Sequence, residues 1–327
     1  MAGLNKYITP ALVLFLLSPA IAELLTGSTP PLLFFFPPLL AIDLALYGCG
    51  ALVIRELAFR WKKGWPTILI LGVAYGLIEE GLAVKSVYNP AYPGVDASIG
   101  RWMGINWIWT LGLVAFHAVI SIAIPILLVT LIFPDKKDKL WASDRTLIIL
   151  AIIMALDVLI LNFAVAHYSP AAMLYVLTIA AIAVLVAIAR LFPIRLRPYT
   201  VKLLRPRIFF IFGFIWLILY YLTVFIPSML KPGIIPVVLV MLAFYALSAW
   251  VFMRMTGNGG SWNDSQKLTL AAGILGPYII LTPLREVLGA RGSILVGITA
   301  AVFLYWLNRR VNRREEAMER TRSSPGS

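Results

Sequence analysis

Residues 66–84 read PTILILGVAYGLIEEGLAV, and this stretch decides the fold class. It is almost wholly apolar and close to the roughly 20 residues that a helix needs to cross the hydrocarbon core of a bilayer. Two adjacent glutamates, Glu79 and Glu80, interrupt it. An ionisable side chain near the centre of a membrane helix costs about 3 kcal/mol, so its presence calls for a reason. The stretch therefore predicts a membrane-spanning helix that carries a polar site.

Composition extends this interpretation to the whole chain of 327 residues, of which 61% are hydrophobic and 13% charged. Soluble domains carry about 25% charged residues. The net charge of +13 comes from basic residues in loops and at the C-terminus, where they hold segments on the cytoplasmic side, so we expect no nucleic-acid partner. The single cysteine, Cys49, cannot form an intrachain disulfide. The expected fold is an all-α, polytopic transmembrane helical bundle in the cell membrane, with the lipid bilayer as its surroundings.

Apolar segments of sufficient length recur about ten times along the chain. The predicted spans are 8–27, 31–54, 66–84, 103–133, 146–166, 171–192, 208–227, 234–253, 268–284 and 292–308. Basic residues gather in alternate loops, which places both termini in the cytoplasm. The first span has an alternative interpretation, a cleaved signal peptide ending at Ala20-Ile21-Ala22.

We expect one integral membrane domain over residues 1–327. Within it, residues 66–170 form the core with the glutamates, 208–308 add spans of unknown role, and 309–327 form a basic cytoplasmic tail. The extracytoplasmic loop 85–102 is rich in glycine, proline and aromatic residues. It is either an interfacial aromatic belt or a lid over a site.

Glu79 shares one helix face with small residues. At about 100° per residue, Gly72, Gly76, Glu79 and Ala83 lie within about 60° of one another. Small residues at this spacing allow close helix packing, so Glu79 is expected to point into the bundle. Glu80 lies about 100° further round and either joins the site or reaches toward the interface, where Lys85 could pair with it.

The next two spans offer polar partners. One face of the fourth span carries Asn106, Thr110, His117 and Ser121 on an otherwise apolar helix. The fifth span adds Asp157, Asn162 and His167, which cannot all face one cavity because successive members are about 140° apart. We select Asn162 or His167 for the site and leave Asp157 as a structural residue.

Glu79-Glu80 on one span, His117 on the next and His167 after it resemble the CAAX-processing and bacteriocin-processing (CPBP, or Abi) protease family. Its distant relatives include PrsW-type proteases and the Aph subunit of γ-secretase. The resemblance covers residues 66–170. Where the family has an arginine four residues after the second glutamate, this chain has Val84 followed by Lys85.

The resemblance implies an intramembrane, metal-independent endopeptidase acting on a membrane-associated peptide or protein, with no cofactor. Glu79 would be the general base and Glu80 its modulator, while His117 orients water or holds the oxyanion, assisted by Asn162 or His167. The substrate-binding candidates are Asn106, Thr110, Ser121 and Lys85. Two alternatives remain: a non-catalytic scaffold that holds a partner subunit, and a proton- or cation-coupled transporter that uses the same residues.

Overall fold

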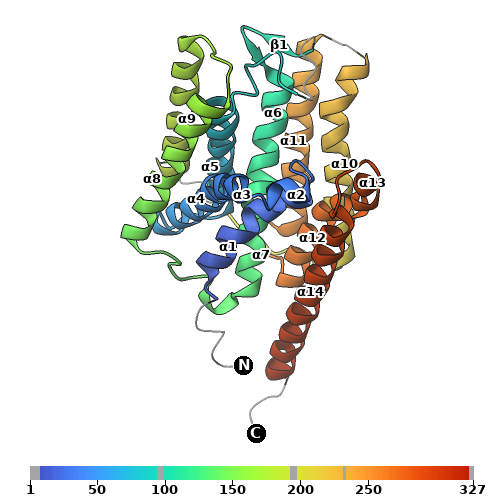
Figure 1. Cartoon of the computed structure of the whole chain (residues 1–327). Helices are drawn as coiled ribbons and strands as arrows, with labels where there is room; N and C mark the ends of the chain where they lie inside the picture. The colour runs from blue at the N-terminus through green and yellow to red at the C-terminus, as the bar shows by residue number, and fades with distance from the viewer. Residues whose placement is uncertain (1–7, 94–98, 192–196, 231–232, 324–327) are drawn as a thin grey trace.

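The computed structural model describes residues 8–93, 99–191, 197–230 and 233–323. Nine helices in these ranges are long and apolar enough to cross a membrane, and Pro10–Leu25 is a shorter apolar helix. This confirms the predicted all-α polytopic bundle (Figure 1). The only strands in the described ranges are two of two residues each, β1 (Arg101–Trp102) and β2 (Ile105–Asn106), which pair antiparallel.

Several spans combine an α-helix with a π-helical turn, written η. The elements up to the fifth predicted span are α1 (Pro10–Pro19), η2 (Ala20–Leu25), α2 (Pro31–Phe34), α3 (Pro37–Asp43), η3 (Leu44–Gly48), α4 (Cys49–Arg60), α5 (Trp65–Leu77), η4 (Ile78–Ala83), α6 (Trp107–Phe116), η5 (His117–Ala123), α7 (Ile124–Ile132), the 3₁₀ turn η6 (Pro134–Lys136), α8 (Asp144–Ile160) and η7 (Leu161–Val165). The later helices are α9 (Ala172–Leu191), α10 (Pro206–Leu230), α11 (Ile234–Thr256), α12 (Asp264–Ile280), α13 (Thr282–Val287) and α14 (Ser293–Ser323).

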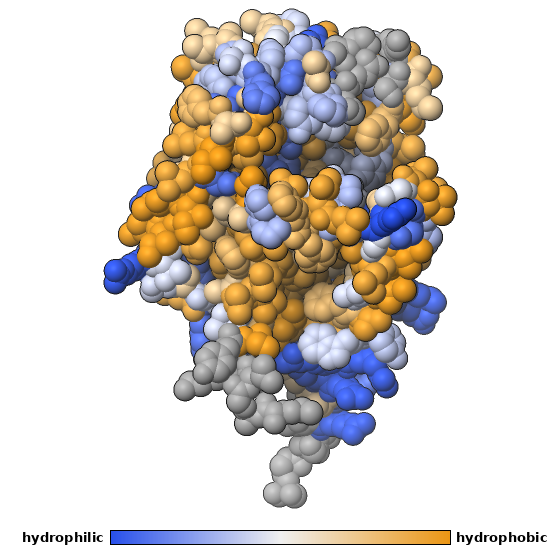
Figure 2. Space-filling view, in the orientation of Figure 1, coloured by the Kyte–Doolittle hydropathy of each residue, from blue (hydrophilic) through white to orange (hydrophobic). Residues whose placement is uncertain are grey.

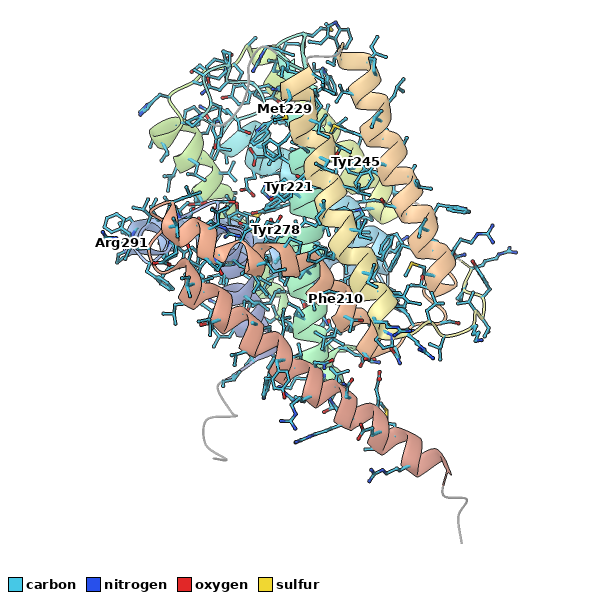
Figure 3. The ribbon with its side chains drawn as sticks, turned by 90° about the vertical axis from the view of Figure 1, so that its right-hand side faces the viewer. Phe210, Tyr221, Met229, Tyr245, Tyr278 and Arg291 are labelled. Carbon is cyan, nitrogen blue, oxygen red and sulfur yellow. The ribbon has the colours of Figure 1, made fainter. Side chains whose placement is uncertain are left out.

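The continuous helix α6–η5–α7 is the most enclosed of the spans and forms the centre of the bundle. α5 packs along η5, with α8 and α9 outside it. On the other side, α10 packs closely on α12. Gly273 allows this close approach, since a Cβ atom at this position would lie 2.2 Å from the Phe210 carbonyl oxygen. Figure 3 shows this pair, in which the Tyr221 and Tyr278 hydroxyls are 2.9 Å apart.

The first predicted span differs from the structure. The helix Pro10–Leu25 is too short for a full span, and the turn after it lies about halfway up the bundle rather than at its upper end (Figure 1). An anchor inside the protein explains this level: Arg285, on α13, donates to the Leu25 carbonyl oxygen at 2.7 Å. Arg291, which follows α13, lies at a similar height to Tyr278 and well below Met229 (Figure 3). Both turns therefore lie at mid-height.

Polarity is distributed as a membrane protein requires. Figure 2 shows hydrophobic residues over the middle of the molecule and hydrophilic residues at its two ends. A hollow in this face lies above α2 and α3, and hydrophilic atoms are visible inside it. α1 begins and α14 ends at one end of the bundle, while β1 lies at the other (Figure 1). The predicted tail 309–327 continues α14 as a helix to Ser323, and residues 324–327 lie outside the described residues.

A buried ion pair fixes the loop between α7 and α8 against α4. Arg55 contacts Glu56 at 2.5 Å, and both side chains are almost fully buried. The Arg55 guanidinium lies 3.9 Å from the Trp141 ring centre and donates to the Lys137 carbonyl oxygen. The Trp141 amide donates to Glu56 at 3.0 Å. This loop is therefore held by buried charges as well as by apolar packing.

We expect Glu56→Gln to destabilise the protein by about 3 kcal/mol, because it leaves the buried Arg55 charge without its partner. Asp144→Asn is the matched control: Asp144 pairs with Arg60 at 2.8 Å, but its side chain is 86% exposed, so its loss should change stability little. Reversible unfolding in detergent measures both variants. Equal destabilisation by the two substitutions would contradict the role given to burial.

The orientation gives a second prediction. In a Cys49→Ala background, we expect Ala91→Cys to react with a membrane-impermeant maleimide added to intact cells. We expect Asp138→Cys to react only after the membrane is opened, because its loop is basic. Both replaced side chains are exposed. The reverse labelling pattern would invert the topology.

Candidate functional site

The two glutamates and His117 meet because α5 and the central helix approach closely. η4 carries Glu79 and Glu80, and η5 begins at His117. A side chain at Gly72 would lie 2.7 Å from the Ala118 Cα atom, and one at Gly76 would lie 3.0 Å from the Val114 Cα atom. The small-residue face predicted on this span is thus the face that contacts the histidine helix.

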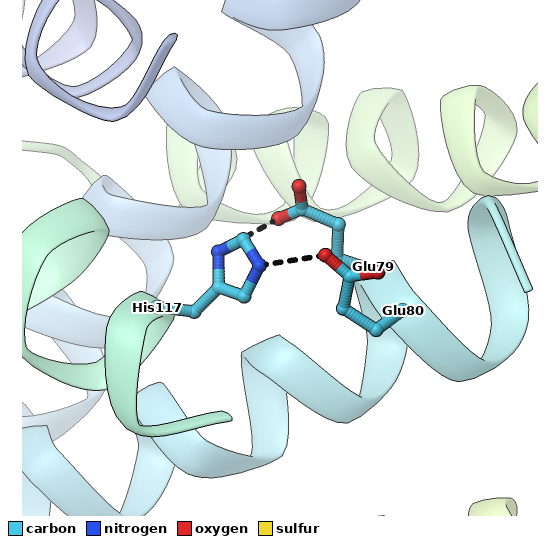
Figure 4. Close-up of side chains that lie close together, drawn as sticks. All are labelled: Glu79, Glu80 and His117. Atoms are coloured by element: carbon cyan, nitrogen blue, oxygen red, sulfur yellow. Dashed lines mark hydrogen bonds and ion pairs between the residues drawn. The ribbon is translucent and has the colours of Figure 1, made fainter. Parts of the chain in front are cut away.

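His117 bridges the two carboxylates (Figure 4). Its Nε2 atom lies 2.9 Å from Glu80 Oε1, and its Nδ1 atom lies 3.3 Å from Glu79 Oε2. Ser121 Oγ, one turn along, is 3.2 Å from the same Nδ1 atom. The three side chains are 5%, 7% and 2% exposed for Glu79, Glu80 and His117, so this pairing takes place away from water.

Glu80 therefore belongs to the site and does not reach for the interface. The local helix geometry accounts for this placement. A π-helical turn is wider than an α-helical one, so successive side chains are separated by a smaller angle. Within η4, this lets the adjacent Glu79 and Glu80 side chains both reach His117.

The other oxygens of the two carboxylates are held by hydroxyl groups. Ser86, from the loop after η4, donates to Glu80 Oε2, and Trp109 Nε1 in turn donates to Ser86 Oγ at 3.1 Å. The Tyr47 hydroxyl, on η3, lies within hydrogen-bond distance of Glu79 Oε1. By contrast, Glu79 Oε2 is buried and makes no hydrogen bond within the described part of the chain. One carboxylate oxygen in the site is thus unsatisfied and faces the imidazole.

Two polar residues that the sequence analysis did not assign to the site complete it. Glu23, on η2, accepts a hydrogen bond from Tyr47 at 2.5 Å and another from Thr29 at 2.6 Å. The Tyr47 ring also stacks on the His117 imidazole, with centroids 6.2 Å apart. The sequence did contain a signal, since Glu23 is an acidic group at the end of an apolar segment.

Polar residues at or beside the site share one unusual backbone feature. The described residues contain five π-helical turns, a conformation that is rare and frequent at functional sites. These turns carry, in chain order, Glu23, Tyr47, the Glu79-Glu80 pair, His117 and Asn162. The site is thus built from local departures in helices that are otherwise regular.

Asn162 and Lys85 lie beside the site and join helices. Asn162 Nδ2 donates to the Leu82 carbonyl oxygen and to the Tyr175 hydroxyl. Lys85 Nζ donates at 2.7 Å to the carbonyl oxygens of Asn162 and Ala166. A cation is favourable at a helix C-terminus, where carbonyl groups lack partners. Lys85 is therefore placed as a helix cap and not as a partner of the glutamates.

Of the remaining predicted residues, some contact the cluster of Glu79, Glu80 and His117 and others do not. Ser121 contacts His117, whereas Asn106 and Thr110 bond within their own helix: Asn106 caps α6 by accepting from the Trp109 amide, and Thr110 donates to the Asn106 carbonyl oxygen. His167 follows η7 and is exposed, so the structure does not bring it to the cluster. Of loop 85–102, residues 94–98 lie outside the described residues, and the described part supplies Ser86.

Glu79, Glu80 and His117 could also hold a metal ion. Each offers one ligand atom, and these atoms lie within 4.8 Å of one another. Carboxylate oxygen and imidazole nitrogen are ordinary ligands of zinc, which in catalytic sites takes three protein ligands and a water. The chemistry open to the site is therefore activation of water or handling of protons, with or without a divalent cation.

Comparison with known proteins assigns the chain to a family but gives no activity for it. No curated protein and no solved structure matches it. One family model matches residues 12–280, which include all of the site described above. The chain belongs to this family, described as an uncharacterized membrane protein family.

Proposed function

We propose that this integral membrane protein is an intramembrane endopeptidase of the CPBP type, in which Glu79 and His117 activate a water molecule. One observation carries the proposal: Glu79 Oε2 is buried, has no hydrogen bond in the described residues, and lies 3.3 Å from His117 Nδ1. Two groups this close are within reach of a single water. The resemblance of the glutamate pair and histidine to that family supports the same assignment.

The partners of His117 suggest how the water is held. An ionised Glu80 accepts a hydrogen bond from the Nε2–H group, which leaves Nδ1 of a neutral imidazole as an acceptor. A water beside Nδ1 and Glu79 Oε2 then donates one hydrogen to each, and at Nδ1 it takes the place of the Ser121 hydroxyl, which lies 3.2 Å from the same atom. When its oxygen attacks a peptide carbonyl, Glu79 takes the proton and later returns it to the leaving amine.

The surroundings of the site suit a substrate that comes from the membrane. The site is level with the α2–α3 turn, because Tyr47 contacts both Glu79 and Glu23, and Tyr47 and Glu23 lie on either side of that turn in sequence. The hydrophilic hollow above α2 and α3 also lies in the upper half of the bundle (Figure 2). A peptide entering there would approach from the extracytoplasmic leaflet, the side on which loop 85–102 is expected.

The test compares variants of the purified full chain on a library of membrane peptides. We expect Glu79→Gln and His117→Ala to reduce cleavage by about 10²-fold or more, the usual contribution of a general base. Glu316→Gln, an exposed glutamate on α14, controls for the substitution itself. Comparison of His117→Ala with His167→Ala decides between the two histidines, and the structure predicts a loss for the first only.

Each alternative gives a different result in the same preparation. Cleavage that survives Glu79→Gln in a folded protein would reject Glu79 as the base. Cleavage abolished by a chelator and restored by zinc would make the site metal-dependent. Absence of cleavage, with proton-coupled uptake into liposomes that Glu79→Gln abolishes, would favour a transporter. A co-purifying subunit lost on mutation would favour a scaffold.

A further inference from the structure

We propose that Tyr47 and Glu23 form a proton relay that carries protons between the buried Glu79 and the mid-height turn at Thr29. The hydrogen-bonded order is Glu79, Tyr47, Glu23, Thr29. The relay requires only that Glu79 exchange protons. It therefore goes beyond the endopeptidase proposal, and only the activity measurement in its test rests on that proposal.

The position of the Tyr47 hydroxyl carries the argument. It lies between Oε1 of Glu23, at 2.5 Å, and Oε1 of Glu79. A phenol has one hydrogen to donate, so it can donate to only one of these carboxyl groups at a time. The second contact is a hydrogen bond only if that carboxyl is protonated and donates to the phenol oxygen. The arrangement thus holds one carboxylic acid and one carboxylate around a tyrosine.

This geometry allows a balanced proton transfer. Protonated Glu79 donates its hydrogen to the Tyr47 oxygen, while Tyr47 passes its own hydrogen to ionised Glu23. Glu79 becomes a carboxylate, Glu23 becomes a carboxylic acid, and Tyr47 ends as a neutral phenol. No other reactant is needed, and the step resets Glu79 as a base. The reverse transfer loads Glu79 with a proton.

The two ends of the relay differ in how exposed they are. Tyr47 is 4% exposed and Glu79 is 5% exposed, so neither exchanges protons with solvent directly. Glu23 is only half-buried and accepts from Thr29, which belongs to the turn between η2 and α2. Glu23 is therefore the more exposed end of the relay, and it is the end that contacts the turn.

Other charged and titratable side chains lie around Tyr47, Glu23 and Glu79. His117 and Tyr75 flank the Tyr47 ring, and Glu80 is joined to Glu79 through His117. Asp43, one residue before η3, is a further carboxyl group close enough to Glu23 for their charges to repel each other. Several carboxyl groups thus surround one imidazole in a setting that disfavours separate charges, which favours sharing protons over full ionisation.

Infrared difference spectroscopy of the purified full chain tests the relay without any substrate. The C=O stretch of protonated carboxyl groups reports their number and their rate of change after a pH jump. We expect Glu23→Gln to remove part of this signal. We expect Tyr47→Phe to slow the change of the remaining buried carboxyl by about 10²-fold, because it deletes the connecting hydroxyl. Tyr245→Phe is the matched control, since the Tyr245 hydroxyl donates to the Leu111 carbonyl oxygen, outside the site.

Equal rates in Tyr47→Phe and Tyr245→Phe would overturn the proposal, and so would a carboxyl signal unaffected by Glu23→Gln. If Tyr47→Phe does not fold, the Glu23→Gln spectrum decides alone. Where cleavage is found, Tyr47→Phe should lower kcat with KM unchanged and raise the solvent deuterium isotope effect. A chain that cleaves nothing but shows the infrared result would keep the relay and reject the endopeptidase proposal.

Discussion

Glu79 and Glu80 are adjacent carboxylates in the middle of an apolar bundle, and each needs partners to be kept there. An unpartnered charge in such a place is far more costly than a neutral group, and a buried polar group without a hydrogen bond costs several kcal/mol. His117, Ser86 and Tyr47 supply those partners from η5, from the loop after η4 and from η3. The arrangement of the central helices follows from bringing these donors to one level.

The same requirement explains why the N-terminal hairpin stops at mid-height. Tyr47 reaches Glu79 and also contacts Glu23, so η2 and η3 must lie side by side at the level of the site. Thr29, which donates to Glu23, then fixes the intervening turn there. Arg285 binds the Leu25 carbonyl oxygen from α13 and joins a second mid-height turn to the first. An outer-surface loop after Thr26 would break these contacts.

The fold class, most of the spans and the central pair of helices were predictable, because hydropathy and small-residue spacing are local properties of sequence. Glu79, His117 and Ser121 were predictable for the same reason: each stands out in an apolar helix face. Glu23 and Tyr47 were not assigned, because their role depends on contacts between helices far apart in the chain. Helical spacing left the placement of Glu80 open, since the angle of a regular α-helix does not apply to a π-helical turn.

Lys85 does not neutralise the two glutamates, although it lies close to them in sequence. It is a buried cation a few residues from two carboxylates, yet its Nζ atom binds the carbonyl oxygens of Asn162 and Ala166. The ion pairs of Glu79 and Glu80 in the described part of the chain are with His117, which carries at most one positive charge. Two carboxyl groups therefore share one imidazole, and a third, Glu23, is joined to them through Tyr47. Protons can balance the charges of these carboxylates. The number of protons that the site holds then changes with any step that consumes or releases one. A site built in this way is suited to proton transfer, which water activation, proton coupling and the Tyr47 relay all require.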